Sequence, residues 1–229
     1  MSPTIRAYLA EFLGTFMLVF IGTAVATLQG GPLGDYGSGG LLMISFAFGG
    51  TLMVLVYVIG PVSGCHLNPA VTIPMVISGR LPGSQAAGYI LSQFGGGLAA
   101  SLVLRLLLSG LPAFHAGQPI GANGNPHNME KWALLGWELI LTALFLFTIF
   151  SATRKDFTPG FTALAIGGFL FIAHLVGAQL GDSSLNPARS LGPALVQGGA
   201  AVTDVWIFCV GPVIGGIVGW FLYKVVYGD

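Results

Sequence analysis

Two short segments carry most of the polar chemistry of this otherwise apolar chain. Residues 66–72 are His-Leu-Asn-Pro-Ala-Val-Thr, and residues 184–190 are Ser-Leu-Asn-Pro-Ala-Arg-Ser. An Asn side chain caps a helix well, and proline fits the first helical position because no N–H is needed there. We therefore predict helices of about ten residues that begin at Asn68 and Asn186. The residues that open these helices are Pro69, Ala70, Pro187 and Ala188.

The chemistry available at such helix starts is hydrogen bonding. Each start carries a partial positive charge of about half an elementary charge, and the Asn amide adds N–H donors. No nucleophile–base pair or phosphate-binding loop accompanies them, and the two cysteines assemble no metal site because no acidic cluster lies near them. The sequence therefore predicts a protein that is not an enzyme and that holds no cofactor and no metal.

The composition is that of a membrane protein. The chain has 229 residues, of which 54% are hydrophobic and 7% are charged, whereas roughly 25% of a soluble domain is charged. Eight basic residues balance eight acidic ones, so nothing suggests a nucleic-acid partner. Long apolar runs extend over the whole length, which predicts a single transmembrane domain, residues 1–229.

Six segments are apolar over the roughly 20 residues that a membrane-spanning helix needs. They cover residues 5–28, 41–60, 83–109, 131–151, 158–178 and 203–226. The segments 61–79 and 179–197, which contain the two Asn-Pro-Ala phrases, are too short to span and too apolar for ordinary loops. We predict an all-α membrane protein of six transmembrane helices plus two re-entrant half-helices, in which segment 61–68 descends into the membrane as a loop.

The two halves of the chain resemble each other. Residues 10–15 are Ala-Glu-Phe-Leu-Gly-Thr at the first span, and residues 137–142 are Trp-Glu-Leu-Ile-Leu-Thr early in the fourth. Three spans per half invert the second copy, which gives repeats of approximately 1–109 and 131–229 joined by an outer loop, 110–130. Inverted repeats with paired interrupted helices favour a site at their interface, near the middle of the membrane.

The charged residues predict how the chain is oriented. One side of the six-span arrangement carries Arg6, Arg80, Arg154, Lys155 and Lys224. The other side carries Asp35, Glu130, Lys131, Asp182 and Asp204. Lysine and arginine are enriched on the cytoplasmic side of membranes, so we expect an integral, multi-pass protein of the cell membrane with both termini in the cytoplasm.

With these features the sequence resembles the aquaporin, or major intrinsic protein, family, and above all its water-selective bacterial or archaeal members. The resemblance is carried by Leu-Asn-Pro-Ala at 67–70 and 185–188, Ser-Gly-Cys-His at 63–66, Arg189-Ser190, Glu11 and Glu138. It covers essentially the whole chain. It implies an hourglass fold of six spans, a homotetramer with one pore per subunit in the lipid bilayer, and passive flow of water or small neutral solutes.

The six-span arrangement brings several side chains to one level near the outer end of the pore. Phe48 lies roughly 10 Å below the outer end of the second span, and His174 lies about one turn from the outer end of the fifth. Arg189 follows Asn186 by one turn, and Ser183 approaches along the preceding segment. These positions match the aromatic/arginine filter of the family, in which Arg189 would repel cations and His174 would narrow the passage.

The filter residues favour water as the solute. Phe48, His174 and Arg189 have the identities found in the family's water channels, and Ser183 is small and polar, as is usual there. Glycerol channels of the family typically carry Trp, Gly and another aromatic residue, with Asp in place of Ser190. A facilitator of glycerol or another small neutral solute is the alternative.

Proton exclusion is expected from the two helix starts. Donors from Asn68 and Asn186 would fix a central water as an acceptor, so that the hydrogen-bonded file reverses there, as is described for aquaporin pores. Backbone carbonyls of residues 64–66 and 182–184 would offer acceptors on either side.

Three further polar residues each have two candidate roles. Glu11 and Glu138 lie within spans, where a carboxylate can serve a proton relay. Their repeat-related positions favour a structural role, in which they accept hydrogen bonds from the two irregular segments. His66 can line the inner pore or hold the loop, and the sequence leaves both roles open.

The filter residues also have ordinary structural explanations. Phe48 can be a core aromatic, and His174 can be a buried, hydrogen-bonded histidine. The two Asn-Pro-Ala phrases can simply cap buried helices, although this leaves the inverted duplication unexplained. Arg189 is the hardest to explain in this way, because an intramembrane arginine is costly and usually functional.

Two departures from the family pattern bear on selectivity. Asp182 replaces the usual small neutral residue beside the outer filter, and Cys209 lies where water channels often have an aromatic residue. Either could relax the selectivity for water. Two other classes of function are a proton-coupled carrier that uses Glu11 or Glu138, and a purely structural protein of membrane junctions.

Overall fold

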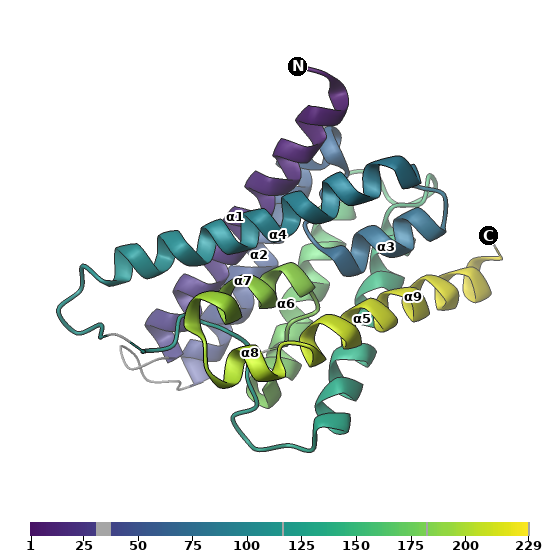
Figure 1. Ribbon diagram of the computed structural model, residues 1–229. Helices are drawn as coiled ribbons and strands as arrows, with labels where there is room; N and C mark the ends of the chain where they lie inside the picture. The colour runs from purple at the N-terminus through teal and green to yellow at the C-terminus, as the bar shows by residue number, and fades with distance from the viewer. Residues whose placement is uncertain (31–37, 116, 182, 229) are drawn as a thin grey trace.

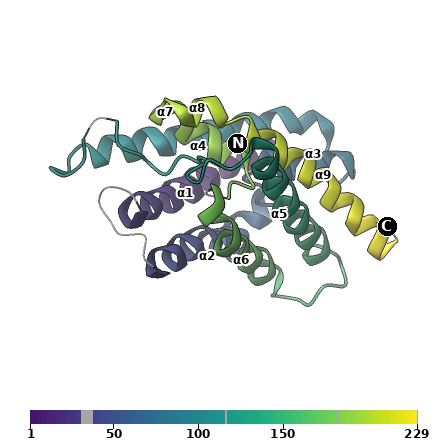
Figure 2. The ribbon, with the colours of Figure 1, turned by 90° about the horizontal axis from the view of Figure 1, so that it is seen from below.

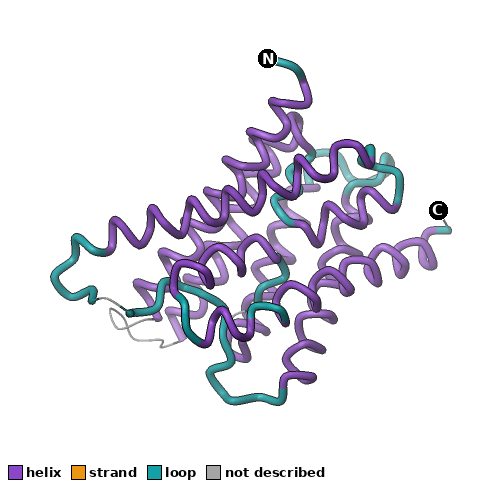
Figure 3. The backbone as a smooth tube through the Cα atoms, in the orientation of Figure 1, coloured by secondary structure: helices purple, strands orange, loops and turns teal. Residues whose placement is uncertain are grey.

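The computed structural model describes residues 1–30, 38–115, 117–181 and 183–228, and their regular structure is helical throughout (Figure 3). The long helices are α1 (Pro3–Gly30), α2 (Ser38–Ser63), α4 (Gly83–Leu108), α5 (Lys131–Ala152), α6 (Thr162–Gly181) and α9 (Ile207–Tyr227) (Figure 1). The short helices are α3 (Pro69–Ile77), α7 (Pro187–Gln197) and α8 (Ala200–Asp204). The predicted all-α architecture is confirmed.

Six helices of the described chain are long and apolar enough to cross a membrane, as predicted. The border of α2 differs, because this helix continues through Pro61 to Ser63, whereas the sequence predicts that 61–68 is a loop. Proline removes one hydrogen bond from a helix, but the next turn is closed by the Gly64 amide, which donates to the Gly60 carbonyl at 2.9 Å. The descending loop therefore begins at residue 64.

The last span is less regular than the sequence predicts. Residues 203–226 are expected as one helix, but the short helix α8 ends at Asp204 and α9 begins at Ile207. Gly198 and Gly199, with φ of 80° and 61°, separate α7 from α8. The two glycines adopt a left-handed backbone at little cost, so the chain turns sharply before the final crossing.

Both short helices begin where the Asn-Pro pairs predict. Asn68 caps α3 with an extended backbone, φ −160°, and its Oδ1 accepts from the Ala70 amide at 2.8 Å. Asn186 caps α7 with φ −154° and accepts from the Ala188 amide at 2.9 Å. α3 has 9 residues and α7 has 11, so the predicted half-helices and their caps are confirmed.

The helices pack in a pattern with two-fold character. α1 packs on α4 and α5 packs on α9, while α2 and α6 pack on each other between the halves. Figure 2, which views the bundle from below, shows α2 and α6 side by side, flanked by α1 and α5. Each half-helix lies against a span of the other half, since α3 packs on α9 and α7 packs on α4. This exchange places both Asn-Pro-Ala phrases inside the bundle.

Two glycines allow the half-helices to dock closely. A Cβ atom on Gly97 of α4 would lie 2.4 Å from the Ala188 carbonyl oxygen, and one on Gly216 of α9 would lie 2.3 Å from the Ala70 carbonyl oxygen. Both distances are far below a normal contact, and the obstructing atoms belong to the backbone. Small residues at these positions are therefore required for α4 and α9 to approach the two helix starts.

Candidate functional site

Both half-helices are preceded by strained backbone. Cys65 and Leu67 have φ of 55° and 53°, and Ser183 and Leu185 have φ of 31° and 52°. A residue other than glycine costs about 1–3 kcal/mol in this left-handed region. Such a backbone turns consecutive amide N–H groups to one side, and in each half a carboxylate lies on that side.

Glu11 is the carboxylate beside the first segment, and its side chain is fully buried. Its Oε1 accepts hydrogen bonds from Ser63 Oγ at 2.7 Å and from the His66 amide at 2.9 Å. Its Oε2 accepts from the Leu67 amide at 2.6 Å and from Gln93 Nε2 at 2.7 Å. A carboxylate is tolerated in the interior when its oxygens are hydrogen-bonded, so Glu11 and the segment stabilise each other.

Glu138 lies beside the second segment in the same manner. Its Oε1 accepts from the Ser184 amide at 2.7 Å, and its Oε2 accepts from the Leu185 amide at 3.0 Å. These two amides stand at the positions that correspond to 66 and 67 in the first half. Both carboxylates thus accept hydrogen bonds from an irregular segment, which is the structural role that their repeat-related positions favour.

Asn68 and Asn186 each brace the segment of the other half. Asn68 Nδ2 donates to the Leu185 carbonyl at 2.7 Å. Asn186 Nδ2 donates to the Leu67 carbonyl at 2.9 Å. The side-chain oxygens of both residues cap their own helices, which assigns the amide nitrogens to these reciprocal bonds. The two helix starts are therefore joined to each other at the centre of the molecule.

A narrow cavity lies beside these residues. Its volume is about 20 Å³, and a cavity needs a volume of about 10–15 Å³ to hold one water molecule. Leucine and phenylalanine side chains form much of its wall. The polar residues that line it are His66, Asn68, His174, Ser184, Asn186 and Arg189. The cavity therefore has room for about one water molecule at a time, beside polar groups from both halves of the chain.

Three of the residues predicted for a filter lie against one another at this cavity. The rings of Phe48 and His174 stack with their centroids 4.5 Å apart and their planes at 16°. The guanidinium carbon of Arg189 lies 4.8 Å from the centroid of the Phe48 ring. None of the three is more than 2% exposed. A cation beside an aromatic face is stabilised electrostatically, so Phe48 helps to fix the place of Arg189.

Ser183 lies near this group, and its hydroxyl faces the backbone of α6, the helix that carries His174. Its hydroxyl is 3.5 Å from the Ala173 carbonyl oxygen of α6. Gly177 of α6 is also close, because a Cβ there would lie 2.5 Å from Ser183 Oγ. In the described part of the chain, the wall of the cavity includes Ser184 and not Ser183. The structure thus brings the other three predicted filter residues together and directs the Ser183 hydroxyl toward α6.

Hydrogen bonds assign the ring nitrogens of two histidines at the cavity. His174 Nδ1 lies 2.9 Å from the Leu170 carbonyl oxygen, which can only accept, so Nδ1 carries the hydrogen. His66 Nδ1 lies 3.2 Å from Thr72 Oγ1, whose own hydroxyl donates to the Asn68 carbonyl. His66 Nδ1 is therefore also a donor. In its neutral form each ring then has Nε2 as an acceptor, at the cavity that both rings line.

Gln93 and Asn123 form hydrogen bonds with residues of the site, although neither was predicted from the sequence. Gln93 is fully buried in α4, and besides its bond to the Glu11 carboxylate it donates to Thr72 Oγ1 at 2.8 Å. A glutamine in the middle of an apolar span is a signal that sequence reasoning could have followed. Asn123 accepts a hydrogen bond from Arg189 Nη1 at 3.0 Å. It belongs to a loop rich in polar residues, where nothing in the sequence distinguishes it.

Asp182 and Cys209 are the two residues that depart from the family pattern. Asp182, beside the predicted outer filter, lies outside the described residues. Cys209 is half-buried in α9 and carries a free thiol, as does the buried Cys65. The two cysteines therefore stand as thiols in separate parts of the fold.

Comparisons with known proteins concern the whole chain. The family model described as "MIP: Major intrinsic protein" matches residues 1–223. Aquaporin Z of Rhodopseudomonas palustris is 41% identical over 223 residues, which cover 96% of this chain and 92% of that protein. Aquaporin Z of Bradyrhizobium diazoefficiens is 39% identical over the same shares. The X-ray structure of the aquaglyceroporin from Plasmodium falciparum has the same fold, with a TM-score of 0.82 over 98% of both chains at 23% identity.

Proposed function

Because the chain belongs to the major intrinsic protein family, a family of transporters rather than enzymes, we propose that it is a passive water channel. Water would cross in single file, while ions and protons are excluded. The observation that carries this proposal is the cavity of about 20 Å³ with polar groups from both halves. It has room for about one water at a time, and its polar groups can replace the hydrogen bonds that water loses on leaving the bulk.

Arg189 is the proposed barrier to cations. It keeps a fixed positive charge at the cavity, is 2% exposed, and lies over Phe48. Repulsion between like charges is much stronger in such a site than in water, because little solvent screens it. A cation would also lose most of its hydration shell in a passage of this width, which adds to the barrier.

The two Asn side chains are the proposed barrier to protons. Each amide NH₂ has two N–H donors, and each uses one of them on the carbonyl of the opposite segment. The other N–H of each can donate to a water at the centre, next to the positive ends of α3 and α7. A water that accepts from both sides points its own hydrogens outward in both directions, so a proton cannot pass along the file.

The stack of Phe48 on His174 is the proposed limit on solute size. With ring centroids 4.5 Å apart, the pair leaves no space between its planes, and Arg189 closes a further side. A carbon chain such as that of glycerol needs a wider passage with an apolar wall. A glycerol or small-solute facilitator is the second candidate, and it predicts a passage that opens beyond one water.

The test uses purified protein in lipid vesicles. After a step in impermeant sugar, vesicles with the protein should shrink much faster than empty vesicles, and equal rates would falsify the proposal. A second step with glycerol as the osmolyte separates the two candidates. Rapid reswelling identifies a glycerol facilitator, whereas slow reswelling at the rate of empty vesicles supports a water channel.

A proton-coupled carrier is less well supported, because Glu11 is occupied by structural hydrogen bonds. Four donors of the described chain saturate its two oxygens. A relay would have to break these bonds and release a strained loop. A carrier predicts solute flux that responds to a pH gradient imposed across the same vesicles, and the absence of that response would exclude it. A purely structural junction protein predicts negligible permeability to every solute in the osmotic steps.

The proposed orientation places both termini in the cytoplasm of a cell with this protein in its plasma membrane. Three of the basic residues behind that prediction, Arg80, Arg154 and Lys155, line one pocket of about 570 Å³ together with Tyr223. Arg154 Nε donates to Asp156 at 2.8 Å, and this bond lowers the pKa of the Asp156 carboxyl. A cluster of cations at one end of the spans supports a cytoplasmic location for that end.

A homotetramer in a lipid bilayer is the proposed assembly, with one pore in each subunit. The outward faces of the spans carry large apolar side chains, such as Phe46, 66% exposed, and Leu106, 71% exposed. Exposed apolar surface of this kind is covered by lipid tails or by neighbouring subunits. Chemical cross-linking in native membranes should give a ladder that ends at four chains.

A further inference from the structure

The loop between α4 and α5 reaches the constriction and accepts hydrogen bonds from the Arg189 guanidinium. Arg189 Nη1 donates to the Gly121 carbonyl at 2.8 Å and to Asn123 Oδ1 at 3.0 Å. Ser190 Oγ donates to the same Asn123 oxygen at 2.7 Å. One amide oxygen from the outer loop therefore binds two consecutive residues of α7, both of which are buried.

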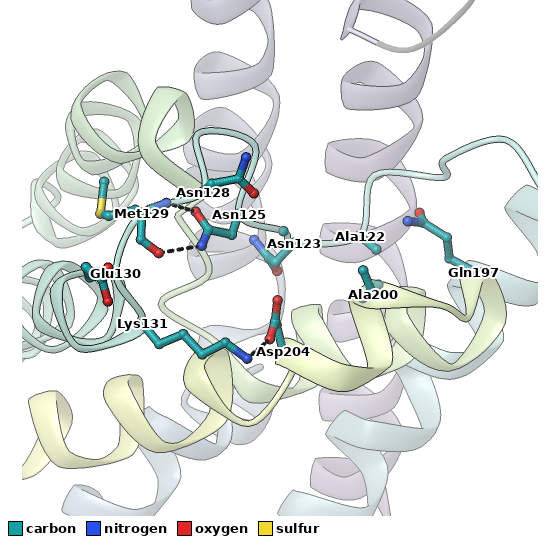
Figure 4. A pocket seen from close by; sticks show the side chains of 12 residues that line it. Ala122, Asn123, Asn125, Asn128, Met129, Glu130, Lys131, Gln197, Ala200 and Asp204 are labelled. Carbon is teal, nitrogen blue, oxygen red and sulfur yellow. Dashed lines mark hydrogen bonds and ion pairs between the residues drawn. The ribbon is translucent and has the colours of Figure 1, made fainter.

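Asn123 differs from the other polar residues of its loop. It is 3% exposed, whereas Asn125 is half-buried and Asn128 is exposed. Asn125 bonds only locally in the described chain, since its side chain donates to the Met129 carbonyl at 2.7 Å and accepts from the Met129 amide at 2.8 Å. Figure 4 shows the Asn125 amide directed at Met129, with Asn123 between Asn125 and Asp204 in the view.

The loop contacts both α7 and α1 before it reaches Asn123. Ile120 is fully buried, and its amide donates to Gln197 Oε1 at 2.9 Å. Gly121 has φ 75°, and a Cβ there would lie 2.9 Å from Thr23 Cβ of α1. The Asn123 oxygen is therefore placed by α1 and α7 rather than by a mobile connection.

Contacts between polar groups continue from Asn123 toward the residue that caps α7. Ser190 Oγ is also in contact with Ser184 Oγ. Ser184 Oγ donates to the Asn186 carbonyl at 2.9 Å and accepts from the Asn186 amide at 3.1 Å. The Arg189 guanidinium and Asn186, which caps α7, are thus linked through the Asn123 Oδ1 atom of the outer loop.

We propose that Asn123 is a positioning residue of the selectivity filter, and that the loop 119–125 is part of the filter rather than only a connection between repeats. This inference rests on the proposed water-channel function. The Asn123 oxygen holds Arg189 against Phe48, so the guanidinium keeps one place at the constriction. Without that oxygen Arg189 loses an acceptor for its charge, and one hydrogen bond to a charged group shifts an equilibrium by roughly tenfold or more.

Three variants in lipid vesicles test the inference. Asn123→Ala removes the acceptor, so Arg189 should leave its place in a fraction of molecules, and the ratio of glycerol to water permeability should rise several-fold. Asn123→Asp keeps an oxygen at the same position and adds a negative charge beside Arg189. It should retain the exclusion of glycerol and increase the flux of sodium ions. Asn125→Ala, in the same loop, should leave both readings at wild-type values.

The outcomes separate this inference from the proposed function. If vesicles with wild-type protein shrink no faster than empty ones, the proposed function fails first. If wild-type protein conducts water and Asn123→Ala has the wild-type glycerol ratio, the inference is overturned. If Asn123→Ala does not fold, as judged by size-exclusion chromatography, Asn123→Asp decides, because wild-type sodium flux in that variant would equally overturn the inference. A loop with only a folding role predicts fewer channels of unchanged selectivity.

Discussion

Arg189 would be expensive to bury without the partners that surround it. Its Nη1 has two acceptors from the outer loop, and its guanidinium carbon lies 4.8 Å from the Phe48 centroid. These contacts offset the loss of hydration and fix the charge in one place. His174 is held in turn by the Leu170 carbonyl, so both polar residues proposed for the filter have a fixed orientation.

Removing both polar side chains of the proposed filter should change which solutes pass. We predict that Arg189→Ala combined with His174→Ala raises glycerol permeability by roughly tenfold or more, because discrimination by size and hydrogen bonding in a narrow site is of that order. Reswelling of vesicles in a glycerol gradient measures it, with the water permeability of the same vesicles as the control. Unchanged exclusion of glycerol would count against the assignment of these two residues to the filter.

Glu11 should matter for stability more than for conduction. Glu11→Gln replaces one acceptor oxygen by an NH₂ group, which must then face donors of the strained segment. Buried donors without acceptors cost about 1–3 kcal/mol each, so we expect a clearly lower temperature of unfolding in detergent. Glu130→Gln makes the same chemical change on an exposed side chain, and it should change stability by less than about 0.5 kcal/mol. Equal unfolding temperatures for the two variants would argue against the structural role.

The residues of the site were predictable where their chemistry conflicts with a membrane. Asn-Pro in an apolar stretch, an arginine at membrane depth and carboxylates within spans all demand an explanation, and each of these residues lies at or beside the cavity. Asn123 could not be found in this way, because a polar loop contains several asparagines and only the fold brings one of them to Arg189. Ser183 shows the same limit, since the sequence predicts that it lies near the level of Arg189 but cannot tell which way its hydroxyl points.

The two half-helices depend on close contact with spans of the opposite half. Gly97→Ala and Gly216→Ala would each drive a methyl group into a backbone carbonyl, at 2.4 Å and 2.3 Å. Overpacking of this kind costs about 1–3 kcal/mol, so both variants should unfold at lower temperature. Their water permeability per folded channel should also fall, because the displaced backbone carries Ala188 or Ala70 next to the capping residues.

Gly168→Ala is the matched control for these packing variants. Gly168 lies within α6 and has no atom within 4 Å of where its Cβ would be. Alanine there should be neutral or stabilising by up to about 1 kcal/mol, because it favours the helix. A loss of stability equal to that of Gly97→Ala would show that the effect is not one of local contact.

The order of helices was predictable from the sequence, and their borders were less so. Apolar length identifies each span, and Asn-Pro identifies the start of each half-helix. The continuation of α2 through Pro61 depends on the Gly64 amide and on the hydrogen bond from Ser63 to Glu11, which is 52 residues away in the chain. The contact between Ser63 and Glu11 spans so much of the chain that it has no local signature in the sequence. The break between α8 and α9 comes a few residues after the turn at Gly198 and Gly199.

The molecule as a whole makes a site that neither half could form alone. α3 packs on α9 and α7 packs on α4, and the Asn of each half bonds to the segment of the other. The strained residues at 65, 67, 183 and 185 lie next to these contacts, so their cost is offset by bonds that exist only when both halves are assembled. Opening of the pore centre should therefore be coupled to separation of the repeats.

The orientation of the chain in the membrane can be measured directly by labelling cysteines. Ala113 is exposed in the outer loop, and Lys155 is exposed in the turn between α5 and α6, at opposite ends of the spans. With the excess of Lys and Arg on the side of Lys155, we predict that a membrane-impermeant maleimide labels Ala113→Cys in intact cells. Lys155→Cys should be labelled only after the cells are opened. Wild-type protein controls for Cys65 and Cys209, of which the first is buried. The opposite pattern would reverse the assignment and place both termini outside.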